Sequence, residues 1–294
     1  MEMADEIRLT LRTNSQAFLA ESVSKAVLAH GEPRQWQFAI TTLVQSLELA
    51  LKAKLEEIHP MFVFENIDDP KHTINITGAI KRLSNPKIGT IHFSETDNKR
   101  LHAAIKLRNE LTHAESRLNV HHAQNSFCFV FSFVADFFRH HLSTSVNEFL
   151  RPADLDQIIQ WNAARKELRK RALHRIAEKN IPDQDIRDCP ECFETTFVLF
   201  DAECACYTCM HHHETVECRR CGTYTYFPEE MISLHDDFDT DLDEGRYVVL
   251  NRFGMDYDEV CPECIGDARN EISTARYDDY VEYMQQEAYY SPHR

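Results

Sequence analysis

The sequence predicts an all-α helical bundle followed by a small, cysteine-rich module that contains β-structure, and three observations predict this division. Glycine is scarce, with 7 residues in a chain of 294, which favours helices over a turn-rich β architecture. Residues 1–187 hold 25 Lys and Arg against 23 Asp and Glu, whereas residues 188–294 hold 7 against 25. Nine of the ten cysteines also lie after residue 188. Charge and cysteine content change at the same place, which indicates a domain boundary there.

The first two helices are predicted from their apolar spacing and their stop signals. The first runs from Ala4 to Gly31, and Pro33 follows as a normal helix stop. The second covers residues 35–59, where leucines recur every four residues and form a core-facing stripe. These leucines are Leu43, Leu47, Leu51 and Leu55.

Four further helices complete the predicted first half of the chain. A short helix is expected at residues 77–83, and Ser94 with Asp97 forms a capping box that opens the next helix. A phenylalanine-rich helix is expected at residues 120–150 and a basic helix at residues 153–179. No strand is expected before residue 188.

The apolar segments predict a cytoplasmic protein. The most apolar run, Phe127–Phe138, is about half the length that a membrane-spanning helix needs. The acidic N-terminus lacks the apolar core of a signal peptide.

The chain is expected to divide into three parts. We expect a helical bundle at residues 1–150, a basic helical connector at residues 151–187 and an acidic module at residues 188–294.

The stretch KLRNELTHAES contains an arginine followed, five positions later, by a histidine. Spacing alone does not select this pair, because the pattern occurs three times. The pairs are Arg108 with His113, Arg117 with His122, and Arg169 with His174. Only the first pair lies inside a well-formed amphipathic helix, so it is the candidate for catalysis.

Helix geometry separates Arg108 from His113. Residues five apart lie about 140° apart around the helix axis, so the two side chains do not share a face. Two copies of the helix packed across a two-fold axis would place both pairs in one cleft. Asn109 and His113 are four apart and do share a face. A site built on this motif therefore predicts a homodimer.

The segment LRNELTHAE, residues 107–115, resembles the Arg-Asn-x-x-x-His signature of the HEPN superfamily (higher eukaryotes and prokaryotes nucleotide-binding domain). The segment at residues 43–67 is similar to the second long helix of that family and the loop that follows it. The resemblance covers roughly residues 35–140. It implies a helical bundle, and many HEPN proteins are metal-independent RNA endonucleases of toxin–antitoxin and anti-phage systems, with the paired motifs at a dimer interface.

The resemblance also implies roles for single residues. Arg108 would stabilise charge on the phosphate, and His113 would act as a general acid or base. Asn109 matches the polar residue that often follows the arginine. Glu48 and Lys52 are similar to an acidic–basic pair of some members, although an ordinary i,i+4 surface pair explains them as well. Some HEPN proteins bind nucleotides without cleaving them.

The residue types suit this chemistry. A histidine can exchange a proton with the attacking 2′-hydroxyl or the leaving 5′-oxygen near neutral pH. An arginine fork matches the non-bridging phosphate oxygens and stays charged. No metal is required, because RNA carries its own nucleophile, and this favours RNA over DNA as the substrate.

The strongest signal in the sequence is four C-x-x-C pairs. They are Cys189/Cys192, Cys206/Cys209, Cys218/Cys221 and Cys261/Cys264. Two such knuckles complete a tetrahedral zinc site with four cysteine ligands, so four predict two structural Zn²⁺ ions in modules that resemble zinc ribbons. The simplest pairing joins the first knuckle with the second and the third with the fourth. Cross-pairing stays open, and Cys204 and His211–His213 are competing ligands.

Other interpretations of the cysteines fit less well. A disulfide framework needs an oxidising compartment, to which nothing directs the chain. A thioredoxin-like site would need a single C-x-x-C before a helix in a βαβ setting.

The negative charge of the C-terminal module, concentrated at His235–Gly245, would repel phosphates. This loop is therefore either a solvated face or a surface that docks a protein or masks the basic helix at residues 165–179.

The sequence thus predicts an RNA endonuclease, a toxin or anti-phage effector, that cleaves with Arg108 and His113 at a homodimer interface. Its expected partners are RNA, a second copy of the chain, and an antitoxin or defence-system protein. The alternative is a non-catalytic HEPN-like nucleotide-binding or adaptor protein whose zinc ribbons recruit a protein partner.

Overall fold

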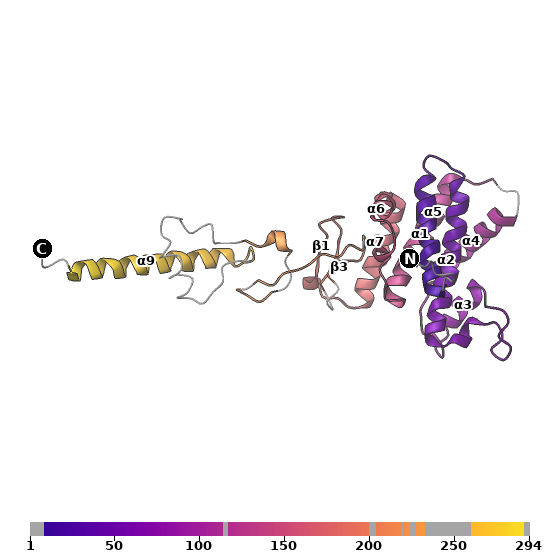
Figure 1. Ribbon diagram of the computed structural model, residues 1–294, viewed down its shortest axis with the longest axis horizontal. Helices are drawn as coiled ribbons and strands as arrows, with labels where there is room; N and C mark the ends of the chain where they lie inside the picture. The colour runs from indigo at the N-terminus through magenta and orange to yellow at the C-terminus, as the bar shows by residue number, and fades with distance from the viewer. Residues whose placement is uncertain are drawn as a thin grey trace, which may run out of the picture. The chain divides into compact units, whose positions relative to one another are not determined.

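The computed structural model of the chain describes residues 9–113, 117–199, 204–218, 220–223, 227–232 and 260–290. Within these ranges the chain forms a mostly helical bundle, followed by a small three-stranded antiparallel sheet and two groups of four cysteines (Figure 1). The predicted fold class is confirmed.

The chain divides into two compact units. The first contains Met1–Pro182, Ile186–Phe197 and Cys206–His211, and the second contains Asp183–Asp185, Val198–Ala205 and His212–Arg294. The predicted boundary at residue 188 lies inside the first unit. That unit holds the helical bundle together with the first two cysteine knuckles, and the second unit holds the other two.

Helices α1 (Leu11–Leu28) and α2 (Gln35–Ile58) pack against each other in the first unit. Helix α1 starts at Leu11 rather than at the predicted Ala4, because the Thr10 side chain caps the helix by accepting from the Thr13 amide. Two buried serines join the pair: Ser15 donates to the Ser46 carbonyl at 2.7 Å, and Ser46 donates to the Ser15 carbonyl at 2.8 Å. Residues 4–8 of the predicted first helix lie outside the described residues.

A loop containing η1 (Pro60–Val63) leads to α3 (Ile76–Leu83), which matches the predicted short helix. The Asn75 side chain caps α3 by accepting from the Gly78 amide at 2.9 Å. Arg82 fixes the loop, because its guanidinium donates to three backbone carbonyls of residues 62–65.

Helix α4 (Glu95–His113) begins where the predicted capping box stands. The Asp97 amide donates to the Ser94 hydroxyl at 3.0 Å, and that hydroxyl donates to the Asp97 carboxylate at 2.7 Å. Near its other end, the Gln37 side chain of α2 donates to the Leu111 carbonyl at 2.9 Å. Both ends of the helix that carries the Arg108 motif are therefore fixed.

Helix α5 (Val120–His141) lies at the centre of the first unit and packs against α2, α4 and α7. Its phenylalanines Phe127, Phe131, Phe137 and Phe138 are fully buried. The helix ends at His141 instead of the predicted Leu150. Ser143 adopts a positive φ of 47° that breaks the helix, and η2 (Val146–Glu148) follows.

The predicted helix at residues 153–179 is two helices, α6 (Pro152–Gln160) and α7 (Asn162–Glu178), so the prediction of one was wrong. Trp161 between them is extended, with ψ of 123°. Its ring packs against His30, Trp36 and Phe127 at centroid distances of 5.3–6.2 Å. Trp161 is half-buried, and packing its large ring against three aromatic side chains outweighs one continuous helix.

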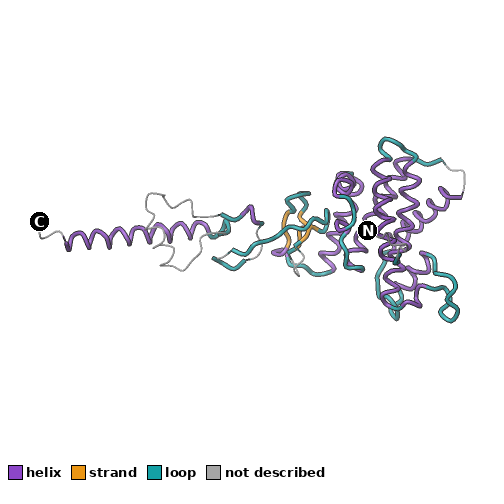
Figure 2. Tube along the Cα trace, in the orientation of Figure 1, coloured by secondary structure: helices purple, strands orange, loops and turns teal. Residues whose placement is uncertain are grey.

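Three short strands follow α7 and η3 (Asp183–Asp185). They are β1 (Ile186–Asp188), β2 (Thr195–Val198) and β3 (Ala205–Cys206), in the order β1-β2-β3. Figure 2 draws the strands in orange. The first strand starts two residues before the position where strands were expected to begin.

The second unit contains η4 (Pro228–Glu230) and the long helix α9 (Ile265–Tyr290), which the sequence analysis did not predict. Near the start of α9, Ala268 and Ile272 are buried. An isolated bridge pairs Ile232 with Val260. The acidic loop His235–Gly245 lies outside the described residues.

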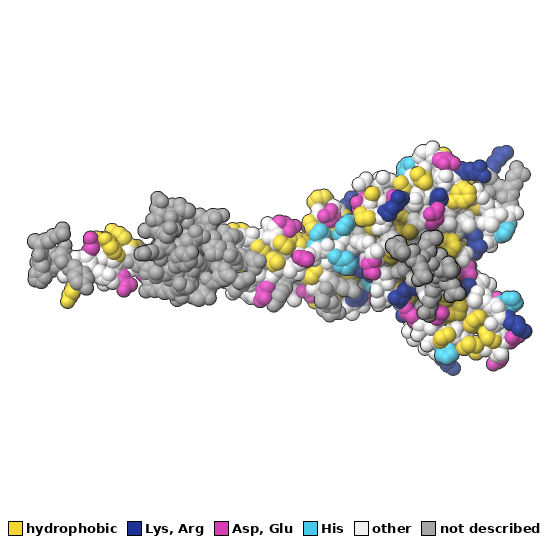
Figure 3. All heavy atoms as spheres, viewed as in Figure 1, with side chains coloured by type: hydrophobic (Ala, Val, Ile, Leu, Met, Phe, Trp, Pro, Cys, Tyr) yellow, Lys and Arg dark blue, Asp and Glu magenta, His cyan; other side chains and the backbone are white. Residues whose placement is uncertain are grey.

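On the face of the first unit seen in Figure 3, lysines and arginines are interspersed with acidic side chains and histidines. In the part of the chain that the structure describes, no helix has both the length and the apolar character needed to cross a bilayer.

The central role of α5 predicts a large difference between two phenylalanine truncations. Phe131→Ala removes a fully buried ring stacked on Phe127, and it should lower the free energy of unfolding by about 3–5 kcal/mol. Phe38→Ala on α2 removes a ring that is 43% exposed, and it should change this free energy by less than about 0.5 kcal/mol. Urea unfolding followed by circular dichroism measures both. Equal losses would contradict the packing described for α5.

Candidate functional site

Three of the four cysteine knuckles share one turn geometry. In each, the amide of the fifth residue donates to the carbonyl of the first cysteine at 2.8–2.9 Å, and that cysteine's amide donates to the carbonyl of the sixth residue at 2.9–3.0 Å. The fifth residue has a positive φ of 59° at Phe193, 67° at Met210 and 71° at Gly222. This turn brings the two sulfurs of a knuckle to one point.

The first group contains the sulfurs of Cys189, Cys192, Cys206 and Cys209, all buried and all within 4.8 Å of one another. The Cys189–Cys209 and Cys192–Cys206 pairs are each 3.6 Å apart. A tetrahedron around Zn²⁺ with Zn–S bonds of about 2.3 Å has edges of about 3.8 Å. The four sulfurs therefore fit a closed tetrahedral metal site.

Within the first group, the surroundings of Cys206 favour a thiolate. The other three thiols, with Cys189 contributing most, lower the pKa of Cys206. The amides of Thr208 and Cys209 both donate to its sulfur at 3.3 Å. Such donors stabilise a sulfur that carries negative charge and orient it toward a metal.

The second group contains Cys218, Cys221, Cys261 and Cys264, again with all sulfurs within 4.8 Å. Its last knuckle differs from the others, because the Ala268 amide donates to the Cys264 carbonyl and the chain continues directly into α9. Arg220, between the cysteines of the third knuckle, forms an ion pair with Glu271 of α9. The knuckle and the helix are thereby held together.

The two groups correspond to the simplest pairing of neighbouring knuckles. Cys204 and His211–His213 belong to neither group, and the Cys204 sulfur lies 3.2 Å from the Thr215 hydroxyl. Cys128 is buried in the bundle, and burial raises the pKa of its thiol to about 12. Eight cysteines are positioned to hold two metal ions, and four thiolates around a closed site is a donor set that Zn²⁺ takes in structural sites.

The first cysteine group is held against the helical bundle by charged hydrogen bonds from α7. Arg165 donates to the Glu194 carboxylate at 2.9 Å and to the Cys192 carbonyl at 2.6 Å. Arg169 forms a second ion pair with Glu194 at 2.7 Å. Arg169, predicted to lie on a solvated or phosphate-contacting face, is therefore committed to a neighbouring acid.

A second set of contacts comes from α5 and the end of α7. The Arg139 guanidinium donates to the Cys206 carbonyl at 2.9 Å and lies 4.4 Å from the centroid of the Tyr207 ring. Lys179 donates to the Tyr207 hydroxyl at 3.1 Å. The first cysteine group is consequently part of the helical unit's own packing.

The structure places the motif residues near the C-terminal end of α4. Asn109 and His113 are exposed, and His113 is the last residue of the helix. Arg108 is half-buried: its Nε is enclosed and has no hydrogen-bond partner, and the structure records no acidic partner for the guanidinium among the described residues. Other half-buried arginines of the bundle, such as Arg171 and Arg175, pair with carboxylates.

Glu48 and Lys52 form an ion pair on α2 at 2.6 Å. Lys52 is 6% exposed and also donates to the Thr73 hydroxyl at 3.0 Å, beside the bridge between Phe64 and Thr73. The pair therefore holds the loop between α2 and α3. Among the described residues, no recorded contact connects it with Arg108 or His113.

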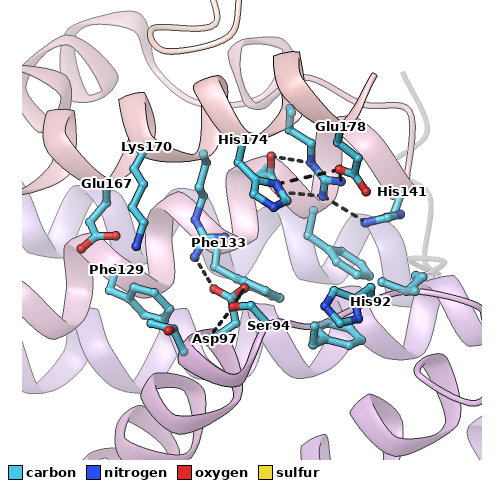
Figure 4. A pocket seen from close by; sticks show the side chains of 17 residues that line it. His92, Ser94, Asp97, Phe129, Phe133, His141, Glu167, Lys170, His174 and Glu178 are labelled. Carbon is cyan, nitrogen blue, oxygen red and sulfur yellow. Dashed lines mark hydrogen bonds and ion pairs between the residues drawn. The ribbon is translucent and has the colours of Figure 1, made fainter. Parts of the chain in front are cut away.

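A pocket of about 280 Å³ lies between the start of α4, α5 and α7 (Figure 4). Two of its half-buried carboxylates are paired with arginines: Asp97 with Arg171 at 2.8 Å and Asp136 with Arg175 at 2.9 Å. Burial and the nearby Arg175 lower the pKa of His141 to about 4, so this histidine is neutral at pH 7. The pocket is a packed ion-pair network at the opposite end of α4 from His113.

A larger hollow of about 860 Å³ lies along the neighbouring faces of α4, α5 and α7. We call it the basic groove. Its charged and titratable lining residues are Arg100, His122, Lys166, Glu167, Arg169 and Lys170. Sequence reasoning identified the basic run of α7 and considered His122 only in a pair with Arg117. It missed Arg100, because only the packing of three helices brings these residues together. None of the predicted catalytic residues lines either hollow.

No protein-family model matches the chain, no curated protein matches it, and no solved structure matches it.

The cysteine groups predict the metal content of single variants. The purified protein should hold two zinc ions per chain, and Cys206→Ser or Cys261→Ser should each leave one, because a group of three thiolates loses most of its affinity. Cys204→Ser, two residues from a proposed ligand, is the matched control and should keep both ions. Elemental analysis of the purified variants measures the zinc content. A loss of zinc from Cys204→Ser, or a single ion in the wild type, would overturn these ligand sets.

Proposed function

We propose that the chain is a metal-independent RNA endonuclease of the HEPN type, with Arg108 and His113 as its catalytic residues and two structural zinc ions. The observation that carries the proposal is the half-buried Arg108, which has no acidic partner among the described residues. A polar group buried without a partner is costly, by about 1–3 kcal/mol, and an arginine kept in this condition suits a site reserved for an anionic ligand.

The position of His113 supports the same proposal. It is exposed at the end of α4, where it can reach a ligand outside the bundle. Because it lies about 140° around the helix from Arg108, one helix does not present both groups to one phosphate. The proposed site therefore lies at the interface of a homodimer, where two copies of α4 contribute two arginines and two histidines.

The proposed reaction uses only groups of the protein and the RNA. One histidine removes the proton of a 2′-hydroxyl, and the 2′-oxygen attacks the adjacent phosphorus. The bond from phosphorus to the 5′-oxygen breaks, and the same histidine, now protonated, gives that oxygen its proton. The guanidinium of Arg108 stabilises the additional negative charge on the phosphoryl oxygens. The products are a 2′,3′-cyclic phosphate and a 5′-hydroxyl.

The resemblance also suggests a biological setting. A toxin or an anti-phage effector of this type would act on cellular or phage RNA, with an antitoxin or another defence-system protein as its partner. The role of Glu48 and Lys52 in such a site stays a prediction, since the structure gives them a role in holding the loop before α3.

One observation favours a second function, a non-catalytic adaptor. The later turns of α9 carry exposed Tyr277, Tyr280, Met284 and Tyr289, with exposures of 45–78%. Exposed tyrosines on one helix are typical of surfaces that bind proteins. In an adaptor, the cysteine module would recruit the partner, and the motif on α4 would not cleave.

Cleavage of RNA by purified protein separates these functions. His113→Ala should lower the cleavage rate by at least about 10²-fold, the usual effect of losing a general acid or base. Arg108→Ala should lower it by about 10²–10³-fold, because the transition-state charge loses its donor. The measurement is a single-turnover assay on labelled RNA, with analysis of the ends of the products.

The matched controls come from the other two arginine–histidine pairs. Arg117→Ala and His174→Ala remove exposed side chains with the same chemistry and should leave the rate within a few-fold of the wild type. A wild-type rate for His113→Ala, or a requirement for added Mg²⁺, would refute the proposal.

A further inference from the structure

In the part of the chain that the structure describes, two cations of the basic groove have no recorded acidic partner. Arg100 pairs with Glu167 at 2.6 Å, and Arg169 pairs with Glu194 at 2.7 Å. For Lys166 and Lys170, both exposed, the structure records no acidic partner among the described residues. The groove therefore keeps an excess of positive charge after its internal ion pairs are formed.

The two lysines stand one turn apart on α7. Residues four apart share a helix face and are separated by about 6 Å along the axis. Like charges at this spacing destabilise a helix by a few tenths of a kcal/mol. Two cations one turn apart, in a hollow that the exposed imidazole of His122 on α5 also lines, suit a ligand with regularly spaced negative charges.

The floor of the groove indicates how such a ligand would be recognised. Its aromatic residue, Phe129, is 5% exposed and already covered by the Arg100 guanidinium at 4.7 Å. This ring does not offer a stacking platform for a base. The groove is thus suited to the charge of a backbone rather than to the identity of bases.

We propose that the basic groove binds the phosphodiester backbone of single-stranded RNA, with Lys166 and Lys170 contacting neighbouring phosphates. The inference rests on the proposed function and deepens it, because it assigns a binding site for the substrate away from the cleaved bond. Ala103, which lines the groove, and His113 lie ten residues apart on α4, about 15 Å along its axis and about 80° around it. An RNA strand that leaves the groove along α4 passes on the side of His113.

The test is the salt dependence of RNA binding. The probe is a fluorescent single-stranded RNA whose 2′-oxygens are methylated, so that no internal 2′-hydroxyl can attack. Each phosphate neutralised contributes about −0.7 to the slope of log affinity against log salt for single strands. The double variant Lys166→Ala/Lys170→Ala should therefore reduce the magnitude of the slope by about 1.4. Between about 50 and 200 mM salt, the wild type should lose about 7-fold more affinity than the variant.

The matched control removes two lysines from a different part of the first unit. Lys81→Ala/Lys87→Ala changes the net charge equally, and both side chains are exposed in and after α3, outside the groove. Alanine suits the helix at positions 166 and 170, and Arg165 and Arg169 stay in place to hold the first cysteine group. Circular dichroism and zinc content should accordingly match the wild type.

Three outcomes would overturn the inference. The first is an unchanged salt slope in the Lys166/Lys170 variant, and the second is an equal change of slope in the Lys81/Lys87 control. The third is a Lys166/Lys170 variant that keeps its RNA affinity but loses binding of a labelled polyglutamate peptide. The last would make the groove a docking site for acidic protein segments. Because the methylated strand is not cleaved, the binding result stands apart from the catalytic proposal: weakened binding with no cleavage of natural RNA would support the groove and reject the nuclease.

Discussion

The first unit depends on the burial of α5, whose phenylalanines occupy the space between α2, α4 and α7. Phe127 and Phe131 are fully buried rings of this helix, and interiors packed this closely transmit changes of volume to their neighbours. Through these contacts α5 positions α4, which carries the Arg108 motif, and α7, which carries the lysines of the groove. The end of α5 also holds the first cysteine group through Arg139.

Charge pairing along α7 connects the helical bundle to the first cysteine group. Arg171 pairs with Asp97 at the start of α4, Arg175 pairs with Asp136 of α5, and Arg165 bonds to Glu194 beside the cysteines. Ion pairs that are partly shielded from water, and that form a network, contribute more than isolated surface pairs. Of the cations of α7 that line the groove, Arg169 pairs with Glu194. Lys166 and Lys170 have no recorded acidic partner in the described part of the chain. The lysines are available to a ligand.

Local patterns predicted much of this architecture, and long-range packing explains what they missed. The leucine repeat and the Ser94 cap located α2 and α4, and the knuckle spacing grouped the cysteines, because each signal lies within a few residues. The break at Trp161 depends on ring contacts with His30, Trp36 and Phe127, which are distant in sequence, and the left-handed Ser143 has no local signature. The change of composition at residue 188 lies inside the first unit, where Arg165 of α7 pairs with Glu194.

The central claim is that one protomer's Arg108 acts together with its partner's His113. Complementation tests it directly: Arg108→Ala and His113→Ala proteins, each inactive alone, are mixed, dissociated and reassembled, and RNA cleavage is measured. About half of the randomly mixed dimers contain one protomer of each variant. Each of these dimers keeps one intact Arg108–His113 pair, whereas the wild-type dimer has two. The expected activity is therefore roughly a quarter of the wild-type activity. A mixture no more active than either variant alone would contradict the shared site.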